Sequence, residues 1–301
     1  MRLVAVKCVV ERTGDGAAEA AAVHGWFDGS LRTLGAEFRE SVLGVEVRDS
    51  APLRKSSLPC GEPGTAFGRL FVTRLVNGKE RQTWRAVGSK EWAKFLAEKT
   101  APHAARFIVD YLDEKGRMSM RAPSVHVDQE IHEADGGGGW LLLQSVVHEE
   151  TFREVDANGA VVEFMRGWAE EHTPVFLECS HSTLHRTEFE EEFLLDHRET
   201  LREVREVLRG YGWITVLPRE IGDRLGGAEV LRETGAFLEV DRLPDGGYWL
   251  RATGTYDEYG MPEVEKVFRA VAPALPAMEP RPERRFPPPQ KIMRVNAGDY
   301  R

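Results

Sequence analysis

Apolar residues occur along this chain in short alternating runs that predict β-strands. The clearest prediction is a hairpin, because Asn77-Gly78 lies between two such runs, 67–76 and 81–87. Asn-Gly between β-forming residues favours the tight turn that joins antiparallel strands. Further runs of this kind predict strands at 3–10, 106–112, 118–127, 140–147, 175–179, 213–217, 236–243 and 248–253.

Other segments have the apolar spacing of amphipathic helices. In 262–275 the apolar residues Val264, Val267, Phe268 and Val271 recur at helical intervals. Ser89 precedes another such segment and is expected to be its N-cap, because a serine hydroxyl accepts an orphan backbone N–H. Helices are also expected from about 159 to 172, within 189–210, and at 218–225 and 229–234. Together these elements predict an α+β fold, with antiparallel sheet covered on one face by helices.

The order of elements indicates two similar α/β halves. Residues 97–102, Ala-Glu-Lys-Thr-Ala-Pro, align with 169–174, Ala-Glu-Glu-His-Thr-Pro, at an offset of 72. Two copies of a hairpin–helix–strand unit would explain this match, and so would two unrelated amphipathic helices that both end at proline. We expect an N-terminal half at 1–155, a C-terminal half at 156–277 and a proline-rich tail at 278–301. The tail is expected to be an extended arm, because seven of the 16 prolines lie between 273 and 289.

Composition narrows the classes of partner. The 301 residues carry a formal net charge of −9, which disfavours a nucleic-acid partner held by phosphate contacts and suits a basic protein or a small ligand. The three cysteines have no paired spacing, so no disulfide framework is expected. No apolar stretch is long enough for a membrane span, and the apolar run at the N-terminus is too short for a secretory signal. The expected location is the cytoplasm.

One polar strand face is a candidate metal site. His126, Asp128, Glu130 and His132 alternate, so their side chains fall on the same face of a strand. The next strand is expected to pair antiparallel with this one. If the numbers of opposite residues add up to 274, His148 lies opposite His126. The set His126, Asp128 and His148 resembles the two-histidine, one-carboxylate facial triad of non-haem iron oxygenases. The alternative is an amphipathic strand whose polar face lies in water.

Two further groups of polar residues have a chemical and a structural interpretation. Cys179 is followed by His181 and His185, which are zinc-ligand types, although Cys179 also ends an apolar strand and fits a buried packing residue. The acidic run 188–193 could contact a basic partner. Its more usual meaning is the solvated face of a helix.

The C-terminal part of the chain resembles a known family. The residues that carry the resemblance are Trp213-Ile214-Thr215, Leu225-Gly226-Gly227, Gly246-Gly247-Tyr248-Trp249-Leu250 and the helical segment 267–275. They resemble the bacterial type VI immunity family over about residues 213–276, with two departures. Thr215 stands where the family more often has Asn, and Asp257-Glu258-Tyr259-Gly260 replaces the family's Gly-Asp pair before the last helix. The resemblance implies a non-catalytic binding protein.

The leading expectation is therefore a cytoplasmic protein that binds a protein partner, such as a basic toxin that it neutralises as an immunity protein. In that interpretation no residue is catalytic. The alternative is a metal-dependent or small-molecule-modifying enzyme that uses the polar strand at 126–132. A third hypothesis is a scaffold whose proline-rich tail docks on another protein. The sequence specifies neither a cofactor nor an oligomeric state, and neither nucleic acid nor membrane is an expected partner.

Overall fold

The computed structural model describes residues 3–44, 59–118, 125–134, 138–150, 155–181, 186–281 and 291–301. The chain divides into two compact units. Unit 1 consists of residues 1–11 and 149–301, and unit 2 consists of residues 12–148. The first strand therefore belongs with the C-terminal half of the chain. The domain boundaries expected from the sequence, after 155 and after 277, stay predictions.

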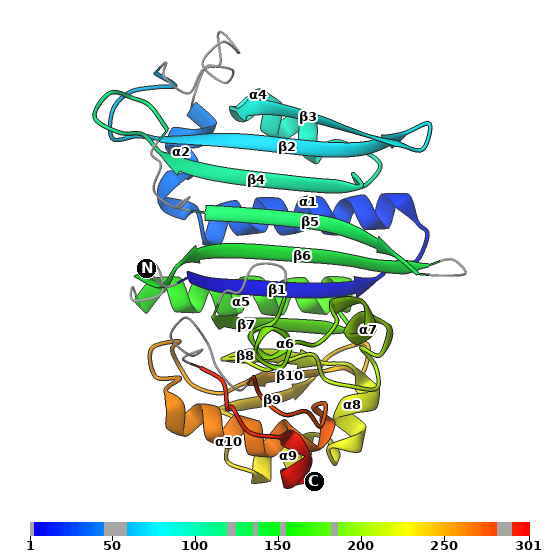
Figure 1. Ribbon diagram of the computed structural model, residues 1–301. Coiled ribbons are helices and arrows are strands. Elements are labelled where there is room, and N and C mark those ends of the chain that lie inside the picture. Colours follow the sequence, from blue (N-terminus) through cyan, green and yellow to red (C-terminus); the bar gives the residue numbers. More distant parts are fainter. Residues whose placement is uncertain are drawn as a thin grey trace. The chain divides into compact units, whose positions relative to one another are not determined.

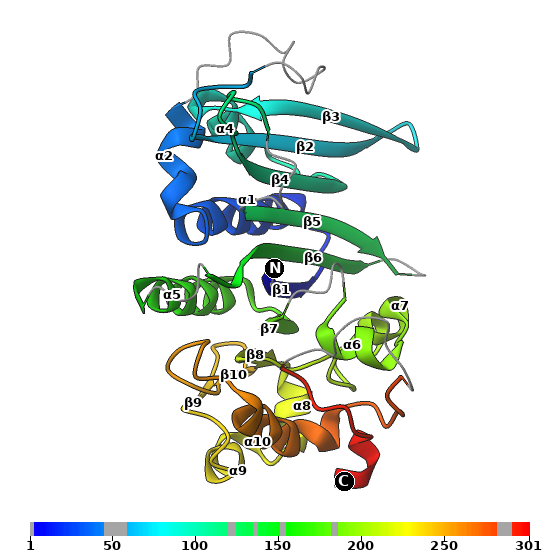
Figure 2. The ribbon, with the colours of Figure 1, turned by 60° about the vertical axis from the view of Figure 1, so that its left-hand side comes forward.

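Unit 2 is an antiparallel sheet with helices on one face. Figure 2 shows α1, α2 and α4 together on one side of the strands of this unit. The core between them is aromatic, with the rings of Phe27 and Phe95 at 5.3 Å and those of Trp92 and Phe107 at 4.8 Å. The helices are α1 (Gly16–Thr33), α2 (Ala36–Gly44) and α4 (Ser89–Leu96). The strands, in the order in which they neighbour one another, are β3 (Lys79–Val87), β2 (Ala66–Val76), β4 (Ala104–Tyr111), β5 (Val125–Glu133) and β6 (Gly139–His148).

Local chemistry explains where several of these elements begin and end. The predicted hairpin is confirmed as β2 and β3, with positive φ at both turn residues, Asn77 (53°) and Gly78 (71°). Asp15 is the N-cap of α1, and its carboxylate accepts hydrogen bonds from the backbone N–H groups of Ala17 and Ala18. The expected cap of α4 is wrong. Gly88 is the N-cap and has no side chain that could make a capping hydrogen bond. Ser89 is the first residue of the helix.

Unit 1 is also an antiparallel sheet, and its strands are covered on both faces. All four residues of β8 are buried. Figures 1 and 2 show α5 on one side of these strands and α6 and α7 on the other. The strands, in neighbour order, are β1 (Leu3–Glu11), β7 (Phe176–His181), β8 (Ile214–Leu217), β10 (Tyr248–Arg251) and β9 (Glu239–Arg242). The helices are α5 (Val155–His172), α6 (Glu188–Phe193), α7 (His197–Arg202), α8 (Arg219–Arg224), α9 (Gly227–Glu233), α10 (Met261–Val271) and the 3-10 turns η2 (Ala272–Ala274) and η3 (Ala297–Tyr300).

The end of the proline-rich tail packs against unit 1. Ile292 and Ala297 are buried, and the ring of Tyr300 meets that of Phe268 edge to face. Nζ of Lys291 lies 3.4 Å from the centre of the Tyr256 ring. Residues 291–301 are therefore part of the folded unit. The prolines at 282 and 287–289 lie outside the described residues.

The expected fold class is confirmed. Both units are α+β, and every described strand pairs antiparallel with its neighbour within its unit. Among the residues described, no helix is both long and apolar enough to cross a bilayer.

Candidate functional site

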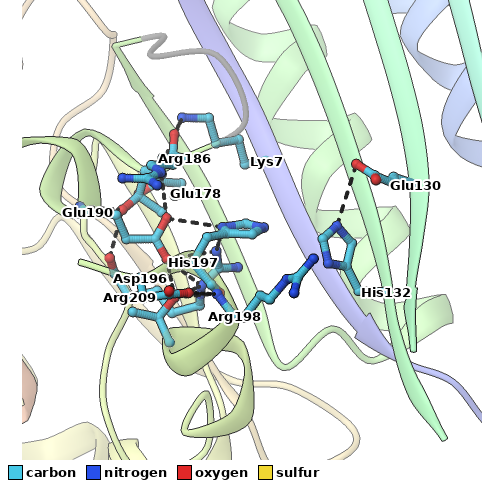
Figure 3. Close-up of polar contacts among 12 residues, drawn as sticks. Lys7, Glu130, His132, Glu178, Arg186, Glu190, Asp196, His197, Arg198 and Arg209 are labelled. Atoms are coloured by element: carbon cyan, nitrogen blue, oxygen red, sulfur yellow. Dashed lines mark hydrogen bonds and ion pairs between the residues drawn. The ribbon is translucent and has the colours of Figure 1, made fainter. Parts of the chain in front are cut away.

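A group of charged side chains from β1, β7, α6 and the segment that follows α7 is buried in unit 1 (Figure 3). Lys7 and Glu178 lie directly opposite each other in the pairing of β1 with β7, so their side chains share one face of the sheet. Nζ of Lys7 lies 3.8 Å from Oε1 of Glu178, and it also donates to the backbone carbonyl of Arg186. Both residues are almost completely removed from solvent.

Glu190 is held by hydrogen bonds from all sides. Thr187 and Glu190 form a capping box at the start of α6, in which the Thr187 N–H donates to the carboxylate at 2.8 Å and the Glu190 N–H donates to the Thr187 hydroxyl at 3.0 Å. Nε of Arg209 donates to Oε1 of Glu190 at 2.9 Å, and the Thr200 hydroxyl donates to the same oxygen. The side chains of Glu190 and Arg209 are 0% and 4% exposed. They form a buried ion pair.

The two buried glutamates titrate in opposite directions. Burial raises the pKa of Glu178 to about 7, and the neighbouring Lys7 ammonium only partly offsets this. Burial also acts to raise the pKa of Glu190, but the Arg209 guanidinium and the hydrogen bond from the Thr200 hydroxyl outweigh it, and this pKa is lowered to about 2. Glu190 is therefore ionised at every physiological pH, whereas Glu178 gains or loses a proton near neutrality.

The geometry gives this cluster a structural role. Its charged groups point at one another, and Arg209 also lies over the ring of Phe176, 5.5 Å from the ring centre. Arg209 Nη2 makes a further hydrogen-bonding contact with Nδ1 of His197 at 3.0 Å. These contacts tie α6 and α7 to the sheet through Arg209, which pairs with Glu190 and His197 and lies over Phe176 of β7. Removal of either Glu190 or Arg209 would lower the stability of the fold, because the other member would remain in the interior as an unpaired charge.

The acidic run 188–193 is not the solvated helix face that its charge suggests. Glu188, Glu190 and Glu192 are 2%, 0% and 0% exposed. Nε of Arg294 lies 2.5 Å from Oε1 of Glu192, so the buried carboxylates have cationic or hydrogen-bonding neighbours. The sequence did contain a usable signal, because Thr187 three residues before Glu190 has the spacing of a capping box.

Cys179 is a packing residue. Its thiol is fully buried, and burial raises its pKa far above the ordinary range, so it is not an activated nucleophile. Its backbone carbonyl accepts a hydrogen bond from the N–H of Trp213 at 2.9 Å. His185, which the sequence placed near it, lies outside the described residues.

The polar face of β5 forms part of the arrangement expected from the sequence. Nε2 of His126 lies 2.8 Å from Oδ2 of Asp128, and Nε of Arg106 donates to Oδ1 of Asp128 at 2.6 Å. Burial acts to raise the pKa of Asp128, but the hydrogen bond from His126 and the contact with Arg106 outweigh it, so the pKa is lowered. Further along the strand, Nε2 of His132 lies 3.5 Å from the Glu130 carboxylate (Figure 3).

The expected register between β5 and β6 differs from the observed one by two residues. His126 lies opposite Val146, not His148, because the paired residue numbers sum to 272. The two-residue slip keeps the same side chains on the same face. It places His148 beyond the described end of β5. The structure therefore brings His126 and Asp128 together, and it does not set His148 opposite them.

Within the described residues, no group of three or more His, Cys, Asp or Glu side chains has an arrangement that could hold a metal ion. His126 and Asp128 would supply two ligands, and Arg106 would have to leave the Asp128 carboxylate. The assignment of His126, Asp128 and His148 to a metal site stays a prediction.

Comparison with solved structures gives a match that covers nearly the whole chain. The chain is similar to the Pseudomonas aeruginosa T6SS protein PA0821, with a TM-score of 0.57 and 11% sequence identity. The match covers 99% of this chain and 80% of that one. At this identity the likeness establishes a shared fold. It spans both units.

The remaining comparisons add no family. No protein-family model matches the chain, and no curated protein matches it. A second solved structure, that of Ara h 8.0201, aligns with 15% identity over 55% of this chain and 94% of the other. Its TM-score of 0.18 carries no structural argument.

Proposed function

We propose that this chain is a non-catalytic cytoplasmic binding protein that neutralises a toxin of a type VI secretion system. The observation that carries the proposal is the structural likeness to a T6SS protein along nearly the whole chain. The resemblance of residues 213–276 to the type VI immunity family agrees with the proposal, and no family model matches the chain.

The distribution of charge suggests how a partner would be recognised. Residues 12–148 contain 18 Lys and Arg and 18 Asp and Glu, so the formal net charge of −9 lies wholly in unit 1. A basic partner would be attracted to unit 1 and not to unit 2, because complementary potentials steer diffusional encounter. This difference in charge supports a basic surface on the partner of unit 1.

The test is whether this chain neutralises a toxin of a type VI secretion system, with the products of the genes adjacent to its own as the candidates. The toxin would be expressed in a bacterial host with and without this chain, and the purified pair would be analysed for a stable complex. Restored growth together with complex formation supports the proposal. A variant with Glu163, Glu170 and Glu171 changed to Lys, which reverses exposed charges on α5, tests whether unit 1 carries the interaction. Growth arrest unaffected by the wild-type chain, with no complex formed, refutes the proposal.

The contact between His126 and Asp128 favours a second candidate function, a metal-dependent or small-molecule-modifying enzyme. Metal analysis of the purified protein would then find a stoichiometric first-row metal, and His126→Ala would lose it. His132→Ala is a matched control on the same strand face, because His132 is outside the proposed ligand set. A protein that neither carries nor takes up metal leaves this hypothesis without support.

A further inference from the structure

The last strand of the unit 2 sheet has an unpaired edge. β3 has β2 as its neighbour on one side, and no strand among the described residues of unit 2 lies on the other. In a hairpin closed by a two-residue turn, the residues beside the turn, Val76 and Lys79, exchange hydrogen bonds, and every second residue after them does the same. The backbone N–H and C=O groups of Glu80, Gln82 and Trp84 therefore point away from β2. Within the described part of the chain, these groups make no hydrogen bond.

Figures 1 and 2 show α4 beside the C-terminal end of β3 and no labelled helix or strand above the half of β3 that is nearest the turn. Six of its nine residues, from Lys79 to Trp84, are exposed. An extended chain could therefore approach these backbone groups directly.

One face of the edge strand carries unpaired positive charge. Lys79, Arg81 and Arg85 alternate, so their side chains share the face on which the helices lie. Arg85 is paired with Glu91 of α4 at 2.7 Å. No described residue forms an ion pair with Lys79 or Arg81. An added strand would place alternate side chains beside these two cations, and carboxylates would be favoured there.

The opposite face of the same strand carries Glu80 and Gln82 near the turn and the aromatic side chain of Trp84 beyond them. The Trp84 side chain is 39% exposed and stacks on Phe71 of β2, with ring centroids at 6.0 Å and planes 12° apart. Leu75, near the turn of β2, is 49% exposed. An added strand would extend this apolar surface with its own side chains on that face.

We propose that the outer edge of β3 binds an extended segment of a partner protein in which carboxylate and apolar side chains alternate. The backbone edge supplies hydrogen bonds, Lys79 and Arg81 select carboxylates, and Trp84 packs against the apolar positions. This site differs in charge and in unit from the toxin contact proposed above and does not depend on it.

A second copy of the chain is a poorer occupant than an acidic segment. Symmetric antiparallel pairing of two β3 strands sets odd-numbered residues opposite odd-numbered ones. A centre at Gln82 would oppose Lys79 to Arg85, and a centre at Thr83 would oppose Arg81 to Arg85. Like charges directly opposite each other are destabilising, which is how edge strands avoid pairing with themselves.

The test uses a fluorescent capped peptide of about seven residues that alternates Val and Glu, a length typical of a strand. Its binding to the full chain would be measured by fluorescence anisotropy. Two ligand controls leave the protein unchanged: the same peptide N-methylated at alternate residues, and a peptide that alternates Val and Lys. Gln82→Pro removes an outward N–H without breaking a bond to β2, and Gln82→Ala is its matched control.

We expect the Val-Glu peptide to bind, and each ligand control, as well as Gln82→Pro, to weaken binding by about tenfold or more. Gln82→Ala is expected to bind like the wild type. Equal binding of the N-methylated peptide would overturn the edge-pairing mechanism, and equal binding of the Val-Lys peptide would overturn the charge selection. No binding of the Val-Glu peptide, or a dimer of the chain that Gln82→Pro dissociates, would overturn the proposal.

Discussion

Arg209→Met tests the account of the buried charge cluster most directly. The substitution keeps most of the side-chain volume and removes the guanidinium that donates to Glu190. Glu190 is 0% exposed, so its carboxylate would stay in the interior without its cationic partner. Loss of one member of a buried ion pair costs about 3–5 kcal/mol. We expect the free energy of unfolding to fall by an amount of that order at pH 7.

The pH dependence gives this prediction its sign. In the wild type, the folded-state pKa of Glu190 is lowered to about 2 from the ordinary 4.5, so its stabilising contribution is present above pH 4.5 and is lost as the pH falls toward 2. Without Arg209, burial dominates and raises this pKa above 4.5. The variant therefore loses stability as the pH rises through 4.5, and its deficit relative to the wild type is larger at pH 7 than at pH 4.

Urea unfolding followed by tryptophan fluorescence at both pH values measures the effect. The double variant Arg209→Met with Glu190→Gln is the control, because it removes the charge that Arg209 compensates while leaving an amide oxygen to accept from Thr187. It is expected to recover part of the loss at pH 7. A deficit below about 1 kcal/mol at pH 7, or one that does not change between the two pH values, would refute the buried-pair account.

Three further predictions concern other parts of unit 1. Glu178→Gln should flatten the dependence of the melting temperature on pH between about 4.5 and 7, because a folded-state pKa raised to about 7 makes the wild type lose stability as the pH rises through that window. Gly212→Ala should lower the free energy of unfolding by about 2 kcal/mol or more, since the added Cβ would lie 2.3 Å from the Cys179 carbonyl oxygen. Its counterpart Gly159→Ala, on α5 with open space around it, should raise the free energy of unfolding by about 0.5–1 kcal/mol, because alanine favours a helix over glycine. Urea unfolding measures both effects. Arg294→Ala should make the peptide bonds after residue 290 more sensitive to limited proteolysis, because it removes the contact with the buried Glu192.

The elements that sequence predicted well are those with a local physical cause. The turn at Asn77-Gly78 needs positive φ at both residues, and few other dipeptides supply it. Likewise Gly226, with φ of 95°, separates the two short helices expected around it. In each case a requirement of a few neighbouring residues decides the structure, so a short window of sequence is enough to predict it.

Predictions that depend on partners distant in sequence were less successful. Adjacent glutamates such as those at 188–193 usually indicate a solvated helix face, yet Arg209 and Arg294, which lie later in the chain, pair with the buried Glu190 and Glu192. The prediction of the register between β5 and β6 was wrong for a related reason. It depends on how the connection after Glu133 is built, and the alternation of side chains is satisfied equally well by sums of 272 and 274.

The order of elements agrees with a duplication, whereas the pairing of strands does not. In chain order, hairpin β2–β3, helix α4 and strand β4 are followed by hairpin β5–β6, helix α5 and strand β7. β4 pairs with β2 of the hairpin before it, but β7 pairs with β1, which comes from the start of the chain. Element order follows from local periodicity, whereas the choice of neighbour depends on which faces become buried together. The alignment at an offset of 72 therefore agrees with a repeated order of elements and does not extend to a repeated pattern of strand pairing.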